Sequence, residues 1–252
     1  LWSFLDYPGK VKCLSDEYFA MLHHAVAETD RLGLNLAVFL CPGWSHAGGP
    51  WVPPEKGLKK LAASARSVTG PMSFNDLLAK PPVLIPRIGG TEVPDWNKDA
   101  ALRPQPRENF FRDVAVLAVP DLGPGKIARM EEVVDLTGRM DAQGRLSWEV
   151  PAGKWTVMRI GHTSTGVENA PAPRTGRGLE CDKLSKEGVE ANFNGMMAKL
   201  IADVGPAAGK VLVATHIDSW ENGAQNWTAR MREEFQARRG YDPFPYLPVL
   251  SG

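Results

Sequence analysis

The sequence shows no excess of either charge and has little cysteine. Lysine plus arginine and aspartate plus glutamate each total 29, so no overall field attracts nucleic acid or an anionic membrane surface. The three cysteines are widely spaced without a CxxC pair, which indicates neither a disulfide framework nor a zinc cluster. No run of about 18 apolar residues predicts membrane insertion, and the N-terminus lacks the basic and hydrophobic regions of a signal peptide. A neutral partner fits this composition best.

What is present is enough apolar sequence for a substantial core and a high number of tryptophans. Of the 252 residues, 43% are hydrophobic, which suits one large domain or two smaller ones. Several of the eight tryptophans stand in glycine- and asparagine-rich contexts. Such rings suit carbohydrate, whose apolar faces stack on aromatics, although core packing explains part of the set equally well.

Residues 1–64 alternate helix and strand. Ser15 and the acids after it predict a helix that ends at Gly33, followed by a buried strand over 34–40. A loop rich in glycine and proline covers 41–51, and 54–63 is compatible with a short helix. The order helix, turn, strand and long loop is typical of an α/β barrel.

The pattern changes between 65 and 154, where prolines, short apolar runs such as 114–119 and turns such as 141–144 predict an inserted antiparallel β domain. Alternating residues and a tight turn lie at 146–154. The strand expected over 156–162 returns to the barrel with His162 at its tip.

The second barrel part is expected over 155–252. Ser185 caps a single helix with one apolar stripe, which consists of Val189, Phe193, Met196, Met197, Leu200, Ile201 and Val204. The run 211–214 does not alternate, as expected of a parallel strand buried on both faces, and Thr228 caps a helix closed by Gly240. The predicted fold class is therefore α/β, a partial (β/α)8 barrel interrupted by a β domain.

The strand after Val211 ends in a cluster of polar and aromatic residues, which are His216, Asp218, Trp220 and Glu221. Barrel enzymes place their active sites at such strand ends. Desolvation of Glu221 by its neighbour Trp220 would raise the carboxyl pKa, as a general acid requires, and Asp218 would hold sugar hydroxyls or a cation. A carboxylate that only caps a helix or braces a loop is the alternative.

A second acidic site, Glu180 and Asp182, follows the preceding expected barrel strand. Four carboxylates in one cleft would need a cation to balance their charge. Hard oxygen ligands favour calcium. His162 and His216 are expected to bind sugar hydroxyls and not the metal. A salt-bridged loop around Asp182 and Lys183 is equally compatible. Trp44 and Trp51 form either a sugar-stacking wall or a packing contact.

Five long segments, in order along the chain, resemble the glycoside hydrolase family 106 α-L-rhamnosidases. They are PGWSHAGGPW (42–51), EVPAGKWTVMRIGHTSTG (149–166), GLECDKLS (178–185), HIDSWENGAQNWT (216–228) and RRGYDPFPYLP (238–248). The resemblance implies an interrupted (β/α)8 barrel, active-site calcium and hydrolysis of terminal α-L-rhamnosides with inversion. On the matched motif, Glu221 is expected to be the general acid.

Family members are much longer, so we expect this chain to be part of a catalytic region whose remaining barrel lies beyond Gly252. The general base is expected there too, and Glu180 is the candidate base inside the chain. The full-length bacterial protein is expected in the periplasm or outside the cell. Alternatives are a non-catalytic carbohydrate-binding protein and a glycosidase for another sugar. Produced alone, the 252 residues are expected to be inactive and poorly soluble, because an open partial barrel exposes strand edges.

Overall fold

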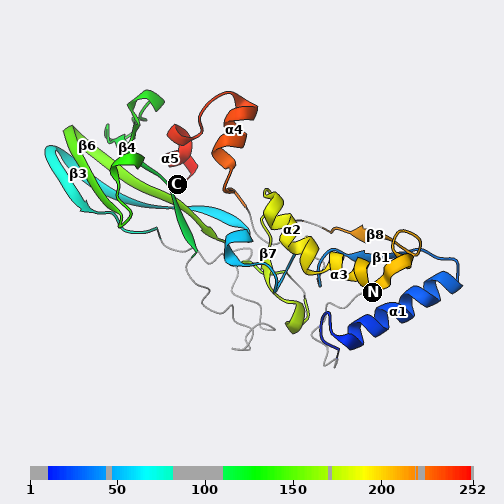
Figure 1. Cartoon of the computed structure of the whole chain (residues 1–252). Coiled ribbons are helices and arrows are strands. Elements are labelled where there is room, and N and C mark those ends of the chain that lie inside the picture. The colour runs from blue at the N-terminus through cyan, green and yellow to red at the C-terminus, as the bar shows by residue number, and fades with distance from the viewer. Residues whose placement is uncertain are drawn as a thin grey trace. The chain divides into compact units, whose positions relative to one another are not determined.

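The computed structural model of the protein describes residues 11–43, 47–81, 110–169, 172–218, 220 and 225–250 (Figure 1). Its α-helices are α1 (Asp16–Arg31), α2 (Lys186–Gly195), α3 (Met197–Val204), α4 (Met231–Arg239) and α5 (Leu247–Leu250). Its strands are β1 (Leu36–Phe39), β2 (Gly48–Gly49), β3 (Lys59–Leu77), β4 (Phe111–Pro120), β5 (Val134–Asp135), β6 (Arg145–Ser164), β7 (Leu179–Glu180) and β8 (Leu212–His216). Short 3-10 turns cover 54–56, 130–132, 137–139, 174–176, 205–207 and 244–246.

The chain forms two compact units. The first comprises Leu1–Leu58, Ile85–Glu108 and Ser164–Gln225, and the second comprises Lys59–Leu84, Asn109–Thr163 and Asn226–Gly252. Among the described helices, none is both long and apolar enough to cross a membrane.

In the first unit, β1 and β8 are parallel neighbours although about 170 residues separate them in the sequence (Figure 1). Leu36 pairs with Leu212 and Phe39 with His216, so the carboxyl ends of both strands lie together. The core of this unit joins α1 and α3 to the two strands through buried side chains, which include Leu22, Val26, Val38, Met197, Leu200, Val204 and Leu212. Burial of each such side chain contributes roughly 1.5–3 kcal/mol before the entropy of ordering is subtracted.

The helix at the start of the chain confirms the sequence prediction. The Ser15 hydroxyl accepts a hydrogen bond from the Tyr18 amide at 3.3 Å, and Gly33 takes a left-handed φ of 65° after the helix. A strand follows as predicted, but it is not a buried one: of its four residues only Val38 is buried, and Leu34 before it is 59% exposed. Residues 54–63 are not a helix, since a single 3-10 turn ends at Lys56 and β3 begins at Lys59.

Two expectations about the first unit are wrong in detail. The helix after Ser185 breaks at Met196, with φ −129° and ψ −67°, so its apolar residues do not form one buried stripe. Val189, Phe193 and Ile201 are exposed. Strand β8 is not buried on both faces either: Val213 is 45% exposed, and of the five residues of the strand only Leu212 is buried.

The second unit contains the antiparallel sheet predicted for the middle of the chain, with strand order β3-β6-β4-β5 (Figure 1). The turn at 141–144 is confirmed: Gly144 has φ 89°, and the Asp141 carboxylate accepts bonds from the amides of Gln143 and Arg145. Residues 156–162 pair with β4 in this sheet and not with a parallel strand. Both faces of the sheet carry apolar clusters, one of which contains Trp227, Phe244 and Leu247 from the C-terminal segment.

In the second unit, one buried arginine joins several segments, and helix α4 ends, but does not begin, where the sequence predicts. Arg159 is almost completely buried and donates two bonds to Asp113, at 2.7 and 2.9 Å, and one to the Leu78 carbonyl at 2.8 Å. Helix α4 starts at Met231 with Arg230 as N-cap, so the predicted cap at Thr228 is wrong, whereas its end at a left-handed Gly240 is confirmed.

Candidate functional site

The carboxyl ends of β1 and β8 bring together an aromatic and a polar group. The rings of Phe39 and His216 meet edge to face, with centroids 4.9 Å apart. His216 Nε2 lies 3.7 Å from Asp218 Oδ2, and both side chains reach solvent. Trp220 is also about half exposed. Three of the predicted site residues therefore lie in one short stretch, where they are accessible to a ligand.

Glu221 lies outside the described residues, but the residues on either side of its segment have defined partners. The Lys183 ammonium lies 5.1 Å from the centroid of the Trp220 ring. The Lys183 amide donates to the Gln225 side-chain oxygen at 3.2 Å, and the Gln225 amide group donates to Asp182. The dipeptide 182–183 thus contacts residues before and after the segment that contains Glu221.

Glu180 is completely buried, and its position depends on glycine in the neighbouring strand. Gly48 pairs with Glu180, and a Cβ atom at Gly48 would lie 2.8 Å from the Leu179 carbonyl oxygen, so a larger residue would push β2 away from β7. Glu180 Oε2 accepts a bond from Lys183 Nζ at 2.6 Å and a longer one from the Ala47 amide at 3.4 Å. Glu180 Oε1 has no hydrogen-bond partner among the described residues.

The chemistry of this cluster suits a hard cation only in part. Calcium takes about six to eight oxygen ligands. Glu180 Oε1 offers one unused buried oxygen, while Asp182 Oδ1 already accepts from the Leu184 amide at 3.0 Å and from Gln225. Over the described ranges, no group of three or more acidic, histidine or cysteine side chains is placed to hold a metal, and Lys183 supplies the positive charge next to Glu180.

Of the two tryptophans predicted to stack on sugar, Trp51 lies among the described residues and Trp44 lies outside them. Trp51 packs against the core of the first unit, and its indole N–H donates to Asn192 at 3.3 Å. A Cβ atom at Gly195 would lie 2.0 Å from the Trp51 ring, so helix α2 approaches this ring closely. The structure gives Trp51 a packing contact, and its role in stacking sugar stays a prediction.

His162 lies in the second unit, on β6, opposite Arg112 of β4. Its ring is nearly buried and lies 5.6 Å from the Phe110 ring, centroid to centroid. Of the other predicted site residues with described positions, those that share a unit with Asp218 and Trp220 are Trp51, Glu180, Asp182 and His216.

Sequence reasoning considered Lys183 as a partner of Asp182, whereas the structure pairs its ammonium with Glu180, and it missed Gln225 and Asn192 altogether. Lys183 stands three residues after Glu180, a spacing that could have suggested an ion pair, whereas the contacts of Gln225 and Asn192 span about 43 and 150 residues of sequence. Beside this cluster, burial raises the pKa of the Cys181 thiol to about 12, which keeps it protonated and unreactive at neutral pH.

A cluster of histidine, carboxylate and tryptophan at the carboxyl end of a parallel strand is the arrangement that α/β enzymes use for their sites. Comparison with known proteins identifies the family. The α-L-rhamnosidase family, glycoside hydrolase family 106, matches over residues 6–126 and 123–252. The chain therefore belongs to glycoside hydrolase family 106. This is the family that the sequence motifs resemble.

Two individual proteins are similar to the chain. A protein of Formosa agariphila, named "Putative beta-glucuronidase", is 32% identical over 278 residues, which cover 98% of this chain and 22% of that protein. The solved structure of a rhamnosidase from Novosphingobium sp. PP1Y matches with a TM-score of 0.78 and 24% identity, over 97% of this chain and 37% of that one. The chain thus spans well under half the length of both relatives, and the structural match shows a shared fold.

Proposed function

We propose that the protein to which this chain belongs removes terminal α-L-rhamnose from polysaccharides or glycosides with inversion at the anomeric carbon. The observation that carries the proposal is the exposed group of His216, Asp218 and Trp220 at the carboxyl end of β8, in a chain of glycoside hydrolase family 106. Glu221 follows Trp220 directly and is the proposed general acid, which protonates the glycosidic oxygen as the bond breaks.

The described residues suggest how the sugar is held. The exposed ring of Trp220 offers an apolar face for the sugar, while Lys183 lies over the same ring and is itself held by Glu180. Asp218 accepts bonds from sugar hydroxyls, and His216 beside it donates or accepts. These contacts would orient the anomeric carbon next to the proposed acid.

An inverting mechanism also needs a base carboxylate about 6.5–9.5 Å from the acid, with water between the two. Glu180 is a poor candidate because it is fully buried and paired with Lys183. We therefore expect the base elsewhere in the full-length protein. The parallel pair β1 and β8, with α1 and α3 packed on it, supports a partial (β/α)8 barrel interrupted by β structure as the architecture.

Calcium is proposed as the cation of the site, with Glu180 and Asp182 supplying two of its oxygen ligands. When bound, it would attract sugar hydroxyls and balance the carboxylates. Titration of the full-length protein with EDTA should lower the midpoint of thermal unfolding, and added calcium should restore it. Identical unfolding with and without EDTA would remove calcium from the proposal.

The acid is tested by Glu221→Gln in the full-length protein, with Glu131→Gln, an exposed carboxylate of the second unit, as matched control. On a rhamnosyl disaccharide, whose leaving group needs protonation, kcat should fall by roughly 10²–10⁴-fold in Glu221→Gln and stay unchanged in the control. On an aryl rhamnoside with a good leaving group the loss should be much smaller. Equal activity of the two variants on the disaccharide would exclude Glu221 as the acid.

A second candidate function is hydrolysis of β-glucuronides, because the relative from Formosa agariphila is named a β-glucuronidase. Parallel assays with aryl α-L-rhamnoside and aryl β-D-glucuronide separate the two by kcat/KM. A sugar-binding protein without activity is the remaining alternative. It predicts heat of binding with rhamnose in titration calorimetry and no hydrolysis of either substrate.

A further inference from the structure

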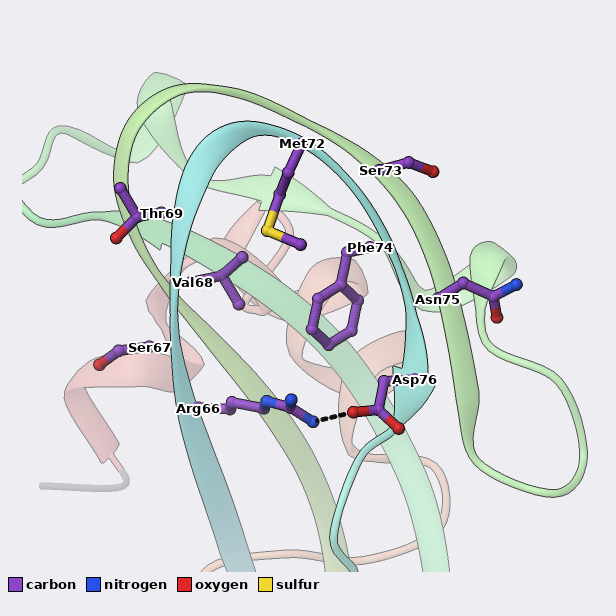
Figure 2. Close-up of a pocket in the computed structure, with 9 residues that line it drawn as sticks. All are labelled: Arg66, Ser67, Val68, Thr69, Met72, Ser73, Phe74, Asn75 and Asp76. Atoms are coloured by element: carbon purple, nitrogen blue, oxygen red, sulfur yellow. Dashed lines mark hydrogen bonds and ion pairs between the residues drawn. The ribbon is translucent and has the colours of Figure 1, made fainter.

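Strand β3 of the second unit bends back on itself at Gly70 and Pro71, and a pocket of about 370 Å³ lies between its two arms. Figure 2 shows that side chains from both arms line it. The volume lies within the range of about 300–1,000 Å³ that small-molecule sites occupy. None of the residues discussed above for acid catalysis or for calcium contributes to it.

The floor of the pocket is apolar. Val68 and Phe74 come from opposite arms and belong to a buried core cluster of the unit, so their positions are fixed by packing (Figure 2). Met72 lies between them in the sequence and is 45% exposed, which leaves apolar surface available to a ligand. The C–H face of a sugar ring is the kind of surface that packs against such a floor.

One end of the pocket carries a fixed pair of opposite charges. Arg66 Nη1 donates to Asp76 Oδ2 at 2.8 Å, and the guanidinium lies 5.0 Å from the centroid of the Phe74 ring (Figure 2). The hydrogen bond from Arg66, followed by one from the Leu77 amide, lowers the pKa of Asp76 and keeps it ionised. A guanidinium has five N–H donors, and the bonds to Asp76 and to the Leu77 carbonyl use Nη1 alone.

We propose that this pocket is a second carbohydrate-binding site, which holds one neutral sugar residue of an oligosaccharide or polysaccharide. Arg66 donates hydrogen bonds and Asp76 accepts them, so the pair can bind two neighbouring sugar hydroxyls. Met72 and Phe74 then face the apolar side of the sugar ring. The pair carries no net charge, so the pocket selects a neutral ligand over an anion. Because Arg66 is held by three contacts before binding, little side-chain entropy is lost.

The side chain of Met72 provides a direct probe. The full-length protein, labelled with ¹³C at the methionine methyl groups, is titrated with methyl α-L-rhamnopyranoside and separately with methyl β-D-glucopyranoside. The Met72 signal is assigned by its loss in Met72→Leu. We expect a saturable shift of this signal with at least one of the sugars, with a dissociation constant on the order of 1 mM.

Two variants and one anion complete the test. Arg66→Met should weaken binding by at least about tenfold, because charge-assisted hydrogen bonds are lost. Arg129→Met, which removes a comparable exposed arginine paired with Glu132 in the same unit, should leave it unchanged. Phosphate should not shift the Met72 signal. An unshifted Met72 signal with both sugars, equal binding by Arg66→Met, or an equal response to phosphate would each overturn the proposal. Hydrolysis assays on the same sample report separately on the proposed function.

Discussion

Replacement of Lys183 by methionine tests the buried cluster beside the candidate site. The Lys183 side chain is 5% exposed and that of Glu180 is 0% exposed, and their charged atoms lie 2.6 Å apart. Removal of the ammonium leaves a carboxylate buried with a single weak contact, to the Ala47 amide. Breaking a buried pair in this way costs about 3–5 kcal/mol. We expect Lys183→Met to lower local stability by this amount.

The assay is amide hydrogen exchange in the full-length protein, followed in peptides that cover 179–185. A loss of about 3–5 kcal/mol corresponds to a fall in protection of roughly two to three and a half orders of magnitude. Lys186→Met is the matched control, because Lys186 is 82% exposed and pairs with Glu190 at 3.6 Å. The control should lose less than about 1 kcal/mol.

A double-mutant cycle isolates the ion pair from other effects of the substitution. In a Glu180→Gln background, Lys183→Met removes one hydrogen bond but also an ammonium that is buried without a counter-charge, so it should cost only about 0.5–1.5 kcal/mol. The difference between the two costs, roughly 1.5–4.5 kcal/mol, is the coupling energy of Lys183 and Glu180. Equal costs in both backgrounds, or equal protection in Lys183→Met and Lys186→Met, would refute the reasoning.

Two further predictions concern packing and burial in the same region. Gly195→Ala should destabilise the first unit by about 1–3 kcal/mol, because the added methyl would lie 2.0 Å from the Trp51 ring, whereas helix propensity alone would favour alanine. The control is Gly138→Ala, because an added Cβ there has nothing within 4 Å. A gain of stability in Gly195→Ala would contradict the close contact between Gly195 and Trp51. Burial raises the pKa of Cys181 from 9.0 in an ordinary thiol to about 12, so iodoacetamide should label it at pH 9 in urea but leave it unlabelled in the native protein. Because the folded state holds this proton more tightly, Cys181 should also lower stability as the pH rises above 9.

Local signals in the sequence predicted several elements correctly. Ser15 and Gly33 bracket α1, and Gly240 ends α4, because caps and left-handed glycines act on residues within one turn of themselves. The Asp141 turn was predictable for the same reason. The break at Met196 was not, since the apolar spacing continues across it and the contact of Gly195 with Trp51 joins segments far apart in the sequence.

The sequence by itself determined the family, the acidic and aromatic residues that follow β8, and the antiparallel character of the middle of the chain. These properties depend on short stretches of neighbouring residues. Only the tertiary structure decided that β1 lies beside β8, that Gly48 lies opposite Glu180, and that Lys183 neutralises this glutamate. The physical reason is that strand pairing and burial depend on which distant segments meet. The i,i+3 spacing permits a pair of Glu180 and Lys183, but it is the packing around Glu180 that buries this carboxylate completely and so requires the pair.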